Sequence, residues 1–183
     1  MLKKGENDPK TLKRLERIEN ASKMLKQRYN ELDYLIKTQT TLKIEEEFEI
    51  CELLHKRVEF LQNLYPSHHI SLECEKTTLK GDATGLAKSV DNLIDNSVKY
   101  SPKGSKIVIR FKEKSLQITD SGEGIDEVDL IRIFDSYYQE DAKAKGFGIG
   151  LSLVKKYCDK NNIELTVKSQ KGVGTAVELK FKG

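Results

Sequence analysis

Apolar residues between positions 9 and 42 recur at alternating steps of three and four, and most residues between them are charged. This period of about 3.5 residues predicts one long amphipathic helix, which Asp8 can cap and Pro9 can begin. The positions on its seam are Leu15, Ile18, Ser22, Leu25, Tyr29, Leu32, Ile36 and Gln39, with Leu12, Met24 and Leu35 beside it. Because such a helix is not stable alone, we expect it to pack in a helical bundle or a coiled-coil homodimer. Packing of the helix on its own domain is the alternative.

After residue 45 the pattern changes to short apolar or alternating runs separated by turn residues, which predict strands, and to longer runs with helical periodicity. The expected strands cover residues 48–50, 70–75, 79–82, 107–112, 116–119, 163–169 and 175–181. The expected helices cover residues 51–64, 83–99, 127–133 and 149–161. Helices interleaved with adjacent antiparallel strands favour an α+β two-layer sandwich, in which a mixed sheet carries helices on one face. We therefore divide the chain into a helical domain, 1–44, and a sandwich domain, 45–183.

Composition excludes some classes of partner. Of the 183 residues 33% are charged, but the formal net charge is only +3, which does not indicate a nucleic-acid partner. No apolar run approaches the roughly 20 residues that span a bilayer, and the first residues lack the apolar core of a signal peptide. We expect a cytoplasmic protein, or the cytoplasmic part of a larger one, that makes no membrane contact itself.

The three cysteines, Cys51, Cys74 and Cys158, are odd in number, and no two of them have the spacing of metal ligands. Reduced thiols are the usual state of such cysteines in a cytoplasmic protein. We therefore expect all three to be free thiols.

The expected helix 83–99 carries Asn92, Asn96 and Lys99 at positions i, i+4 and i+7 of one face. Asparagine is a poor helix former, so two of them one turn apart need a reason. An amide oxygen can ligate Mg²⁺, and amide and ammonium groups can hold phosphate oxygens. Two solvent-exposed or capping asparagines are the alternative.

Two glycine-rich segments add candidate ligand contacts. Residues 118–125 run from a strand into a turn, where Asp120 could accept a hydrogen bond from the exocyclic amine of adenine and the glycines allow a flat ligand to approach. Residues 146–150 open a helix, whose N-terminal N–H groups suit phosphate. Their GxGxG spacing is neither the dinucleotide fingerprint nor a Walker A loop. Taken singly, the first segment is compatible with an ordinary turn.

In one order along the chain, the segments 92–96, 120–124, 146–150 and 172–175 resemble the ATP-binding catalytic domain of bacterial sensor histidine kinases. The superfamily also includes DNA gyrase, the MutL repair ATPases and the ninety-kilodalton heat-shock chaperone. The resemblance covers residues 78–183. In it, 92–101 is similar to the N box, 120–125 to the first glycine box, 133–138 to the F box, 146–151 to the second glycine box and 172–175 to the last.

The resemblance implies ATP and Mg²⁺ as ligands and gives the residues roles. Asn96 would ligate Mg²⁺, Asn92 and Lys99 would contact phosphates, Tyr100 would flank adenine and Asp120 would bind its amine. Residues 135–147 would form a mobile lid. The implied ATP-binding positions are Asn92, Asn96, Lys99, Tyr100, Asp120, Gly122, Gly124, Ile125, Gly146, Phe147, Gly148, Ile149, Gly150, Leu151 and Thr175.

The same resemblance discriminates between two reactions. ATP hydrolases of the superfamily carry a glutamate at the position that matches Asn92, where it activates water. An amide cannot act as a general base, and Asp91 points about 100° away from its neighbour on a helix. The site is therefore expected to transfer the γ-phosphoryl group to an external nucleophile.

Residues 9–42 resemble the second helix of the two-helix hairpin that precedes this domain in the family and dimerises into a four-helix bundle. The first helix of that hairpin carries the acceptor histidine, but no histidine occurs here before His55. We expect His55, His68 and His69 to be surface residues. The chain would then be a partial dimerisation helix, 1–44, with an ATP-binding catalytic domain, 45–183, unable to phosphorylate itself. It would be either a truncated piece of a sensor kinase or a natural protein that acts on another chain.

The resemblance thus implies the kinase core of a two-component sensor, which transfers the γ-phosphoryl group to a histidine outside this chain. Its partners would be the phosphoacceptor histidine helix of the full-length kinase and, through that kinase, a response regulator. The full-length kinase would be a membrane-bound sensor. A serine kinase of the anti-sigma-factor type shares these boxes but lacks the long helix. The intact Asn96, Asp120 and glycine runs argue against a third possibility, a non-catalytic nucleotide-binding scaffold.

Overall fold

The computed structural model describes residues 8, 11–15, 17, 18, 22, 25, 29, 45–134 and 150–182. The chain divides into two compact units, Met1–Ile44 and Glu45–Gly183. In the first unit, the described residues from 11 to 29 are helical, and the apolar side chains of the expected seam among them are 56% to 72% exposed. The remainder of the helix expected over 9–42 lies outside the described residues.

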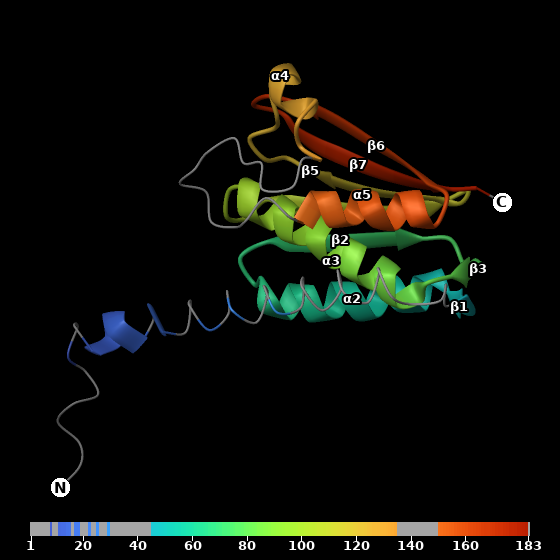
Figure 1. Cartoon of the computed structure of the whole chain (residues 1–183). Helices are drawn as coiled ribbons and strands as arrows, with labels where there is room; N and C mark the ends of the chain where they lie inside the picture. Colours follow the sequence, from blue (N-terminus) through green and yellow to red (C-terminus); the bar gives the residue numbers. More distant parts are fainter. Residues whose placement is uncertain are drawn as a thin grey trace, which may run out of the picture. The chain divides into compact units, whose positions relative to one another are not determined.

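The second unit is built on a five-stranded mixed sheet with the strand order β2-β4-β5-β7-β6 (Figure 1). β2 pairs in parallel with β4, and the other neighbours pair antiparallel. The strands of this sheet are β2 (His69–Cys74), β4 (Lys106–Lys112), β5 (Ser115–Asp120), β6 (Ile163–Gln170) and β7 (Gly174–Phe181). A second, two-stranded sheet pairs β1 (Glu46–Glu49) with β3 (Thr78–Gly81).

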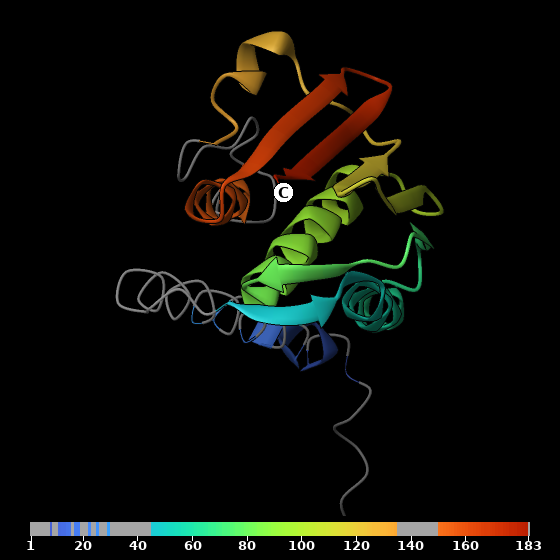
Figure 2. The ribbon, with the colours of Figure 1, turned by 90° about the vertical axis from the view of Figure 1, so that its right-hand side faces the viewer.

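Three helices form a layer on the five-stranded sheet. They are α2 (Ile50–Leu64), α3 (Ala83–Tyr100) and α5 (Gly150–Lys160). α2 packs on β2, α3 on β4 and β5, and α5 on β6, while α3 also contacts both other helices. Figure 2 looks almost along α2 and α5 and shows α3 between them. The predicted two-layer α+β sandwich is therefore confirmed.

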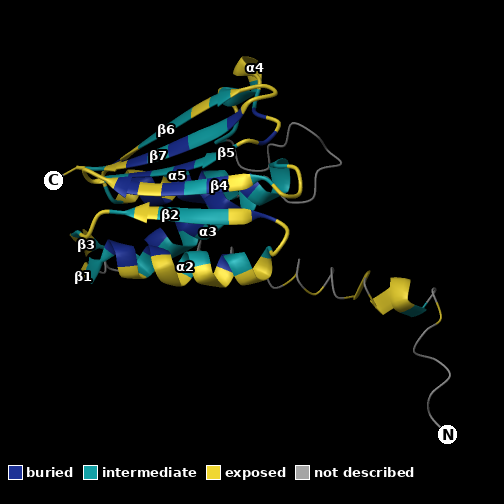
Figure 3. Ribbon diagram, turned by 180° about the vertical axis from the view of Figure 1, so that it is seen from behind, coloured by how far each residue is buried: buried dark blue, intermediate teal, exposed yellow. Residues whose placement is uncertain are grey.

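Alternation along the strands and helical periodicity build one core between the two layers (Figure 3). On β4, Ile107, Ile109 and Phe111 are at most 1% exposed, whereas the residues between them are partly or fully exposed. α3 contributes a stripe of buried side chains at helical spacing, Leu86, Val90, Leu93 and Ile94. The same sequence pattern that predicted these elements thus selects the faces that they bury.

Most element boundaries differ from the sequence prediction by one or two residues, and those of α2 and α4 show the clearest differences. Ile50 was expected to end a strand but begins α2, because the Glu49 carboxylate caps this helix by accepting from the N–H groups of Cys51 and Glu52. The helix expected over 127–133 is the shorter α4 (Glu127–Leu130), and residues 131–134 form turns.

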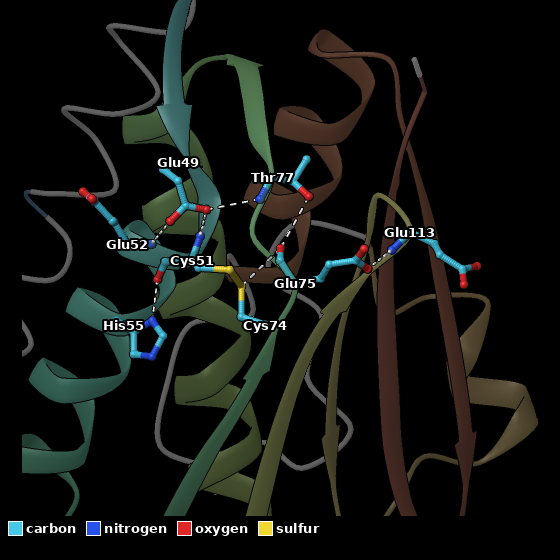
Figure 4. Close-up of a disulfide and its surroundings, with 8 residues drawn as sticks. All are labelled: Glu49, Cys51, Glu52, His55, Cys74, Glu75, Thr77 and Glu113. Carbon is cyan, nitrogen blue, oxygen red and sulfur yellow. Dashed lines mark hydrogen bonds between the residues drawn. A yellow bond between two sulfur atoms is a disulfide. The ribbon is translucent and has the colours of Figure 1, made fainter.

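Cys51 and Cys74 form a disulfide, so the expectation that all three cysteines are free thiols is wrong for this pair (Figure 4). The bond joins the first turn of α2 to the last residue of β2, with the two Cα atoms 5.7 Å apart. Two further contacts hold the junction together. The Ile50 N–H donates to the Thr77 carbonyl, and the Glu49 carboxylate accepts from the Thr77 N–H. The two cysteines are brought together by the packing of α2 against β2, so their spacing in the sequence does not predict the bond.

His68 also departs from its prediction as a surface residue. Its side chain is only 4% exposed, with Nε2 3.4 Å from the Ser101 carbonyl oxygen and Nδ1 3.1 Å from the Ser67 hydroxyl. His55 and His69 are exposed, as predicted. None of the helices within the described residues combines the length and the apolar character that a membrane span needs.

Candidate functional site

The carboxylate of Asp120, at the end of β5, is held by three hydrogen bonds. Its Oδ2 accepts from the Ser97 hydroxyl of α3 at 2.9 Å. Its Oδ1 accepts from the backbone N–H groups of Gly122 at 3.0 Å and of Thr175 at 3.2 Å. The donors come from α3, from the turn after β5 and from β7, so three elements of the fold fix the orientation of one carboxylate.

The turn after β5 approaches its neighbours so closely that glycine is required. A Cβ atom on Gly122 would lie 2.4 Å from the carbonyl oxygen of Tyr100, to which the N–H of Glu123 donates. Gly174, which has a φ of +136°, faces the same strand end. A Cβ there would lie 2.2 Å from the Asp120 carbonyl oxygen. These two glycines allow the backbone of three segments to converge on Asp120.

Gly124 and Ile125 join this turn to the hairpin of β6 and β7. Gly124 has a φ of +64°, and its Cβ would collide with the Gln170 carbonyl oxygen at 2.0 Å. The Ile125 N–H donates to the Ser169 hydroxyl at 2.8 Å, and that oxygen lies 2.8 Å from the Thr175 hydroxyl. Thr175 is therefore fixed through both its N–H and its side chain.

The polar face of α3 meets the beginning of α5 at Asn92. A Cβ on Gly150, the first residue of α5, would lie 3.6 Å from Asn92 Oδ1, which places this amide against the N-terminus of the helix. Asn96 lies one turn further along and is half-buried. Near the C-terminus of α3, Lys99 donates to the Tyr100 hydroxyl at 2.7 Å and lies over that ring, 4.5 Å from its centroid.

The structure thus brings some of the expected site residues together in two places, and others lie outside the described residues. Asp120, Gly122, Thr175 and the backbone of Tyr100 form one cluster, and Asn92 lies beside Gly150 in another place. Leu151, which was expected to contact the nucleotide, packs against the hydrophobic core. The expected contacts Gly146, Phe147, Gly148 and Ile149, and the expected lid, 135–147, lie outside the described residues.

Sequence reasoning missed two serines of this site. Ser97 donates to Asp120, and Ser169 bridges Ile125 and Thr175. Ser97 could have been identified from the sequence. It is buried at the next position of the stripe that includes Leu93 and Ile94, so a hydroxyl group occupies a place where an apolar residue is expected. A buried hydroxyl in such a place indicates a hydrogen-bond partner across the interface.

The polar side chains of the candidate site indicate which chemical groups it could bind. A carboxylate has room for about four hydrogen bonds, and the described residues donate three to Asp120, which among them leaves capacity for one further donor such as a ring amine. The amides of Asn92 and Asn96 and the ammonium of Lys99 offer ligands for a metal ion and for anionic oxygens. Asp91, next to Asn92, is engaged on another side by Arg57 through two hydrogen bonds of 2.7 Å.

Residues 81–183, more than half of the chain, match the family described as "Histidine kinase-, DNA gyrase B-, and HSP90-like ATPase". The chain belongs to this family. Within it, the second unit is the ATP-binding catalytic domain of a histidine kinase. The cluster around Asp120 and the contact between Asn92 and Gly150 both lie inside the matched range.

Individual relatives agree with this assignment. The sensor histidine kinase YkoH of Bacillus subtilis (strain 168) is 31% identical over 97% of this chain, and this chain spans 41% of its length. A solved structure of the mycobacterial sensor histidine kinase MprB is 25% identical, with a TM-score of 0.67 over 74% of this chain and 95% of that one. Full-length ShkA in complex with AMPPNP, 20% identical, shares the fold with a TM-score of 0.66 over 76% of this chain and 31% of its own length.

Proposed function

We propose that the second unit binds Mg²⁺-ATP and transfers its γ-phosphoryl group to a histidine outside this chain. The observation that carries the proposal is the carboxylate of Asp120, held by Ser97, Gly122 and Thr175, with one acceptor position that no described residue occupies. A fixed acceptor suits the exocyclic amine of adenine, whereas guanine carries a carbonyl oxygen at the same place and would be repelled. The site therefore selects adenine nucleotides.

The phosphates would lie between α3 and the N-terminus of α5. Asn92 lies beside Gly150, where α5 begins, and an amide next to the N–H groups of a helix N-terminus suits anionic oxygens. Lys99 would add a positive charge, and the expected contacts at 146–149 would complete the site. Asn96 would hold Mg²⁺, since this ion is commonly bound through one or two side-chain oxygens together with substrate phosphates. When bound, Mg²⁺ supplies charge neutralisation at the phosphates.

Two features support phosphoryl transfer over hydrolysis. Asn92 bears no proton-accepting carboxylate that could activate water. The nearest carboxylate along the helix, Asp91, is bound in a bidentate ion pair by Arg57. The site would thus hold and orient ATP until a histidine of another segment approaches.

The acceptor would be the phosphoacceptor histidine helix of a full-length kinase, and a response regulator would receive the phosphoryl group from that histidine. Residues 9–42 would form a homodimer or a bundle through their apolar seam, whose described side chains are exposed in the single chain. The unit would work as the cytoplasmic part of a membrane-bound sensor, as the kinship with sensor kinases suggests.

Replacement of Asp120 tests the nucleotide assignment. The chain should bind Mg²⁺-ATP in calorimetric titrations, and Asp120→Ala should weaken this binding by about 10- to 100-fold through loss of one charge-assisted hydrogen bond. GTP should bind weakly to the original chain and to the variant alike. Asp159→Ala is the matched control, because Asp159 is an exposed carboxylate paired with Lys155 on α5. Equal ATP affinities of the two variants would show that adenine does not bind at Asp120.

A further inference from the structure

Two hydrogen-bonded pairs, called tethers below, join α2 and its C-cap to two aspartates of α3. Each aspartate immediately precedes one of the two asparagines of the proposed site. Arg57 donates from Nε and Nη2 to the two carboxylate oxygens of Asp91, each at 2.7 Å. The hydroxyl of Tyr65, the C-cap residue that follows α2, donates to Asp95 at 2.7 Å. The two tethers lie one helical turn apart on the same face of α3.

The asparagines lie on another face of the same helix. Each is one residue, or about 100° around the helix, from its tethered neighbour. Asn92 lies against Gly150 of α5, whereas Asp91 faces Arg57 of α2, and α3 lies between these two helices (Figure 2). Any rotation of α3 that loosened the tethers would therefore turn the asparagines relative to α5.

Even a small rotation of α3 would displace the asparagine side chains by more than a ligand site tolerates. A rotation of α3 by about 20° would move side-chain ends, which lie about 5–6 Å from the helix axis, by about 2 Å. Displacements of about 1 Å already have large effects on metal and phosphate geometry. The helix propensity of its residues does not determine how a helix is rotated about its own axis. Contacts with neighbouring elements must therefore do so.

The tethers are suited to this task because they are rigid and partly shielded from water. The Arg57 and Asp91 side chains are 26% and 29% exposed, and the guanidinium lies 4.8 Å from the centroid of the Phe60 ring. Burial raises the pKa of the Asp91 carboxyl above its ordinary value, although the hydrogen bonds and charge of Arg57 act in the opposite direction. Burial likewise raises the pKa of Asp95, against the hydrogen bond from Tyr65. Burial of charged groups costs free energy, which an ion pair on an exposed surface does not incur. Groups that stay partly buried in this way are therefore expected to have a specific role.

We propose that Arg57 and Tyr65 are positioning residues, which fix the rotation of α3 and so aim Asn92 and Asn96 at the phosphates and Mg²⁺. The inference rests on the proposed function, because it concerns how those two asparagines meet the nucleotide. It adds that α2, which contributes no expected ligand contact, controls the phosphate half of the site. The adenine half at Asp120 depends on other elements.

The two halves can be measured separately. In Arg57→Met, which keeps the side-chain stem over Phe60, calorimetry should show that Mg²⁺-ATP binds about tenfold more weakly, as for other residues that orient metal ligands. Adenosine, which contacts only the adenine half, should bind unchanged in an NMR titration. The matched control is Arg110→Met, since Arg110 makes an exposed ion pair with Glu73 between β4 and β2. Its affinities for both ligands should equal those of the original chain.

Tyr65→Phe provides a second, milder test because it removes only the hydroxyl. Its Mg²⁺ titration at fixed ATP should shift to higher Mg²⁺ concentration, whereas Tyr157→Phe, which removes a hydroxyl bonded to the Asp82 carbonyl, should leave the titration in place. If Arg57 acts through Asp91, Asp91→Asn should add little to Arg57→Met.

The results separate the inference from the function on which it rests. An original chain that binds no Mg²⁺-ATP would refute the proposed function. If the original chain binds it, the positioning role fails when both variants keep its affinity. The role also fails when they lose adenosine and Mg²⁺-ATP in equal proportion, because that pattern indicates a general loss of structure.

Discussion

The orientation of Asp120 depends on neighbouring backbone that leaves no room for side chains. Gly174 is the sharpest case, because its φ of +136° disfavours other residues and a Cβ there would lie 2.2 Å from the Asp120 carbonyl oxygen. The N–H of the following residue, Thr175, is one of the three donors to the Asp120 carboxylate. A change at Gly174 should therefore reach the ligand site and the stability of β7 together.

Gly174→Ala should lower the free energy of unfolding by about 1–3 kcal/mol, from backbone strain and the forced shift of β5. It should also weaken ATP binding, because the Thr175 N–H moves away from Asp120. Urea unfolding and calorimetry measure the two effects. Gly81→Ala is the control, since no atom lies within 4 Å of a Cβ at Gly81. Similar unfolding curves for the two variants would contradict this account.

Candidate residues of the site could be proposed from the sequence where their signal is local. Asn92 and Asn96 were proposed as ligands because asparagines are unusual in a helix, and Asp120 because glycines follow it at a strand end. The contact between Asn92 and Gly150 could not be found in this way, since it depends on how α3 packs against α5. Ser97 was missed because its partner lies on a strand that follows much later in the chain.

At the scale of elements, the junction of β1, α2, β2 and β3 is held by the disulfide and by the Glu49 carboxylate. The positions of these elements followed from periodicity, to within a residue or two. Their cross-links did not, because the pairing of Cys51 with Cys74 across 23 residues requires the packed arrangement. Sequence pattern thus predicts elements well and predicts bonds between distant elements poorly.

Reduction of this disulfide should destabilise the second unit. A disulfide that closes a loop of this length lowers the entropy of the unfolded chain, and in this account it stabilises the folded state by about 3 kcal/mol. We expect the urea midpoint of the chain to fall on addition of a thiol reductant. The double variant Cys51→Ser/Cys74→Ser should unfold at the reduced midpoint with or without reductant. A reductant that leaves the original chain unchanged would show that the cross-link contributes nothing.

At the scale of the whole molecule, the chain joins a catalytic unit, Glu45–Gly183, to a first unit, Met1–Ile44, whose described residues from 11 to 29 are helical and expose apolar side chains. The three histidines all lie in the second unit, and one of them, His68, is buried. None lies among residues 9–42, the range expected to resemble one helix of the dimerisation hairpin. The acceptor of the phosphoryl group should therefore come from a different segment.

Incubated with radiolabelled ATP and Mg²⁺, the chain alone should remain unlabelled. A separately produced two-helix domain that carries an acceptor histidine should acquire an acid-labile label when the chain is added, and Asp120→Ala should reduce this transfer. A label on the chain itself would contradict the prediction. An acid-stable phosphoserine on a partner would instead favour the serine-kinase alternative.

The disulfide also determines which thiols can be labelled with chemical probes. It consumes two of the three cysteines, and the third, Cys158, is buried in α5. Burial, together with the nearby charge of Asp159, raises the pKa of the Cys158 thiol to about 12, so it carries almost no thiolate at neutral pH. A cysteine introduced on an exposed position would then be the one reactive thiol of the folded chain. A fluorophore could be attached there without removing any native cysteine, so the binding of ATP to the chain could be followed by fluorescence.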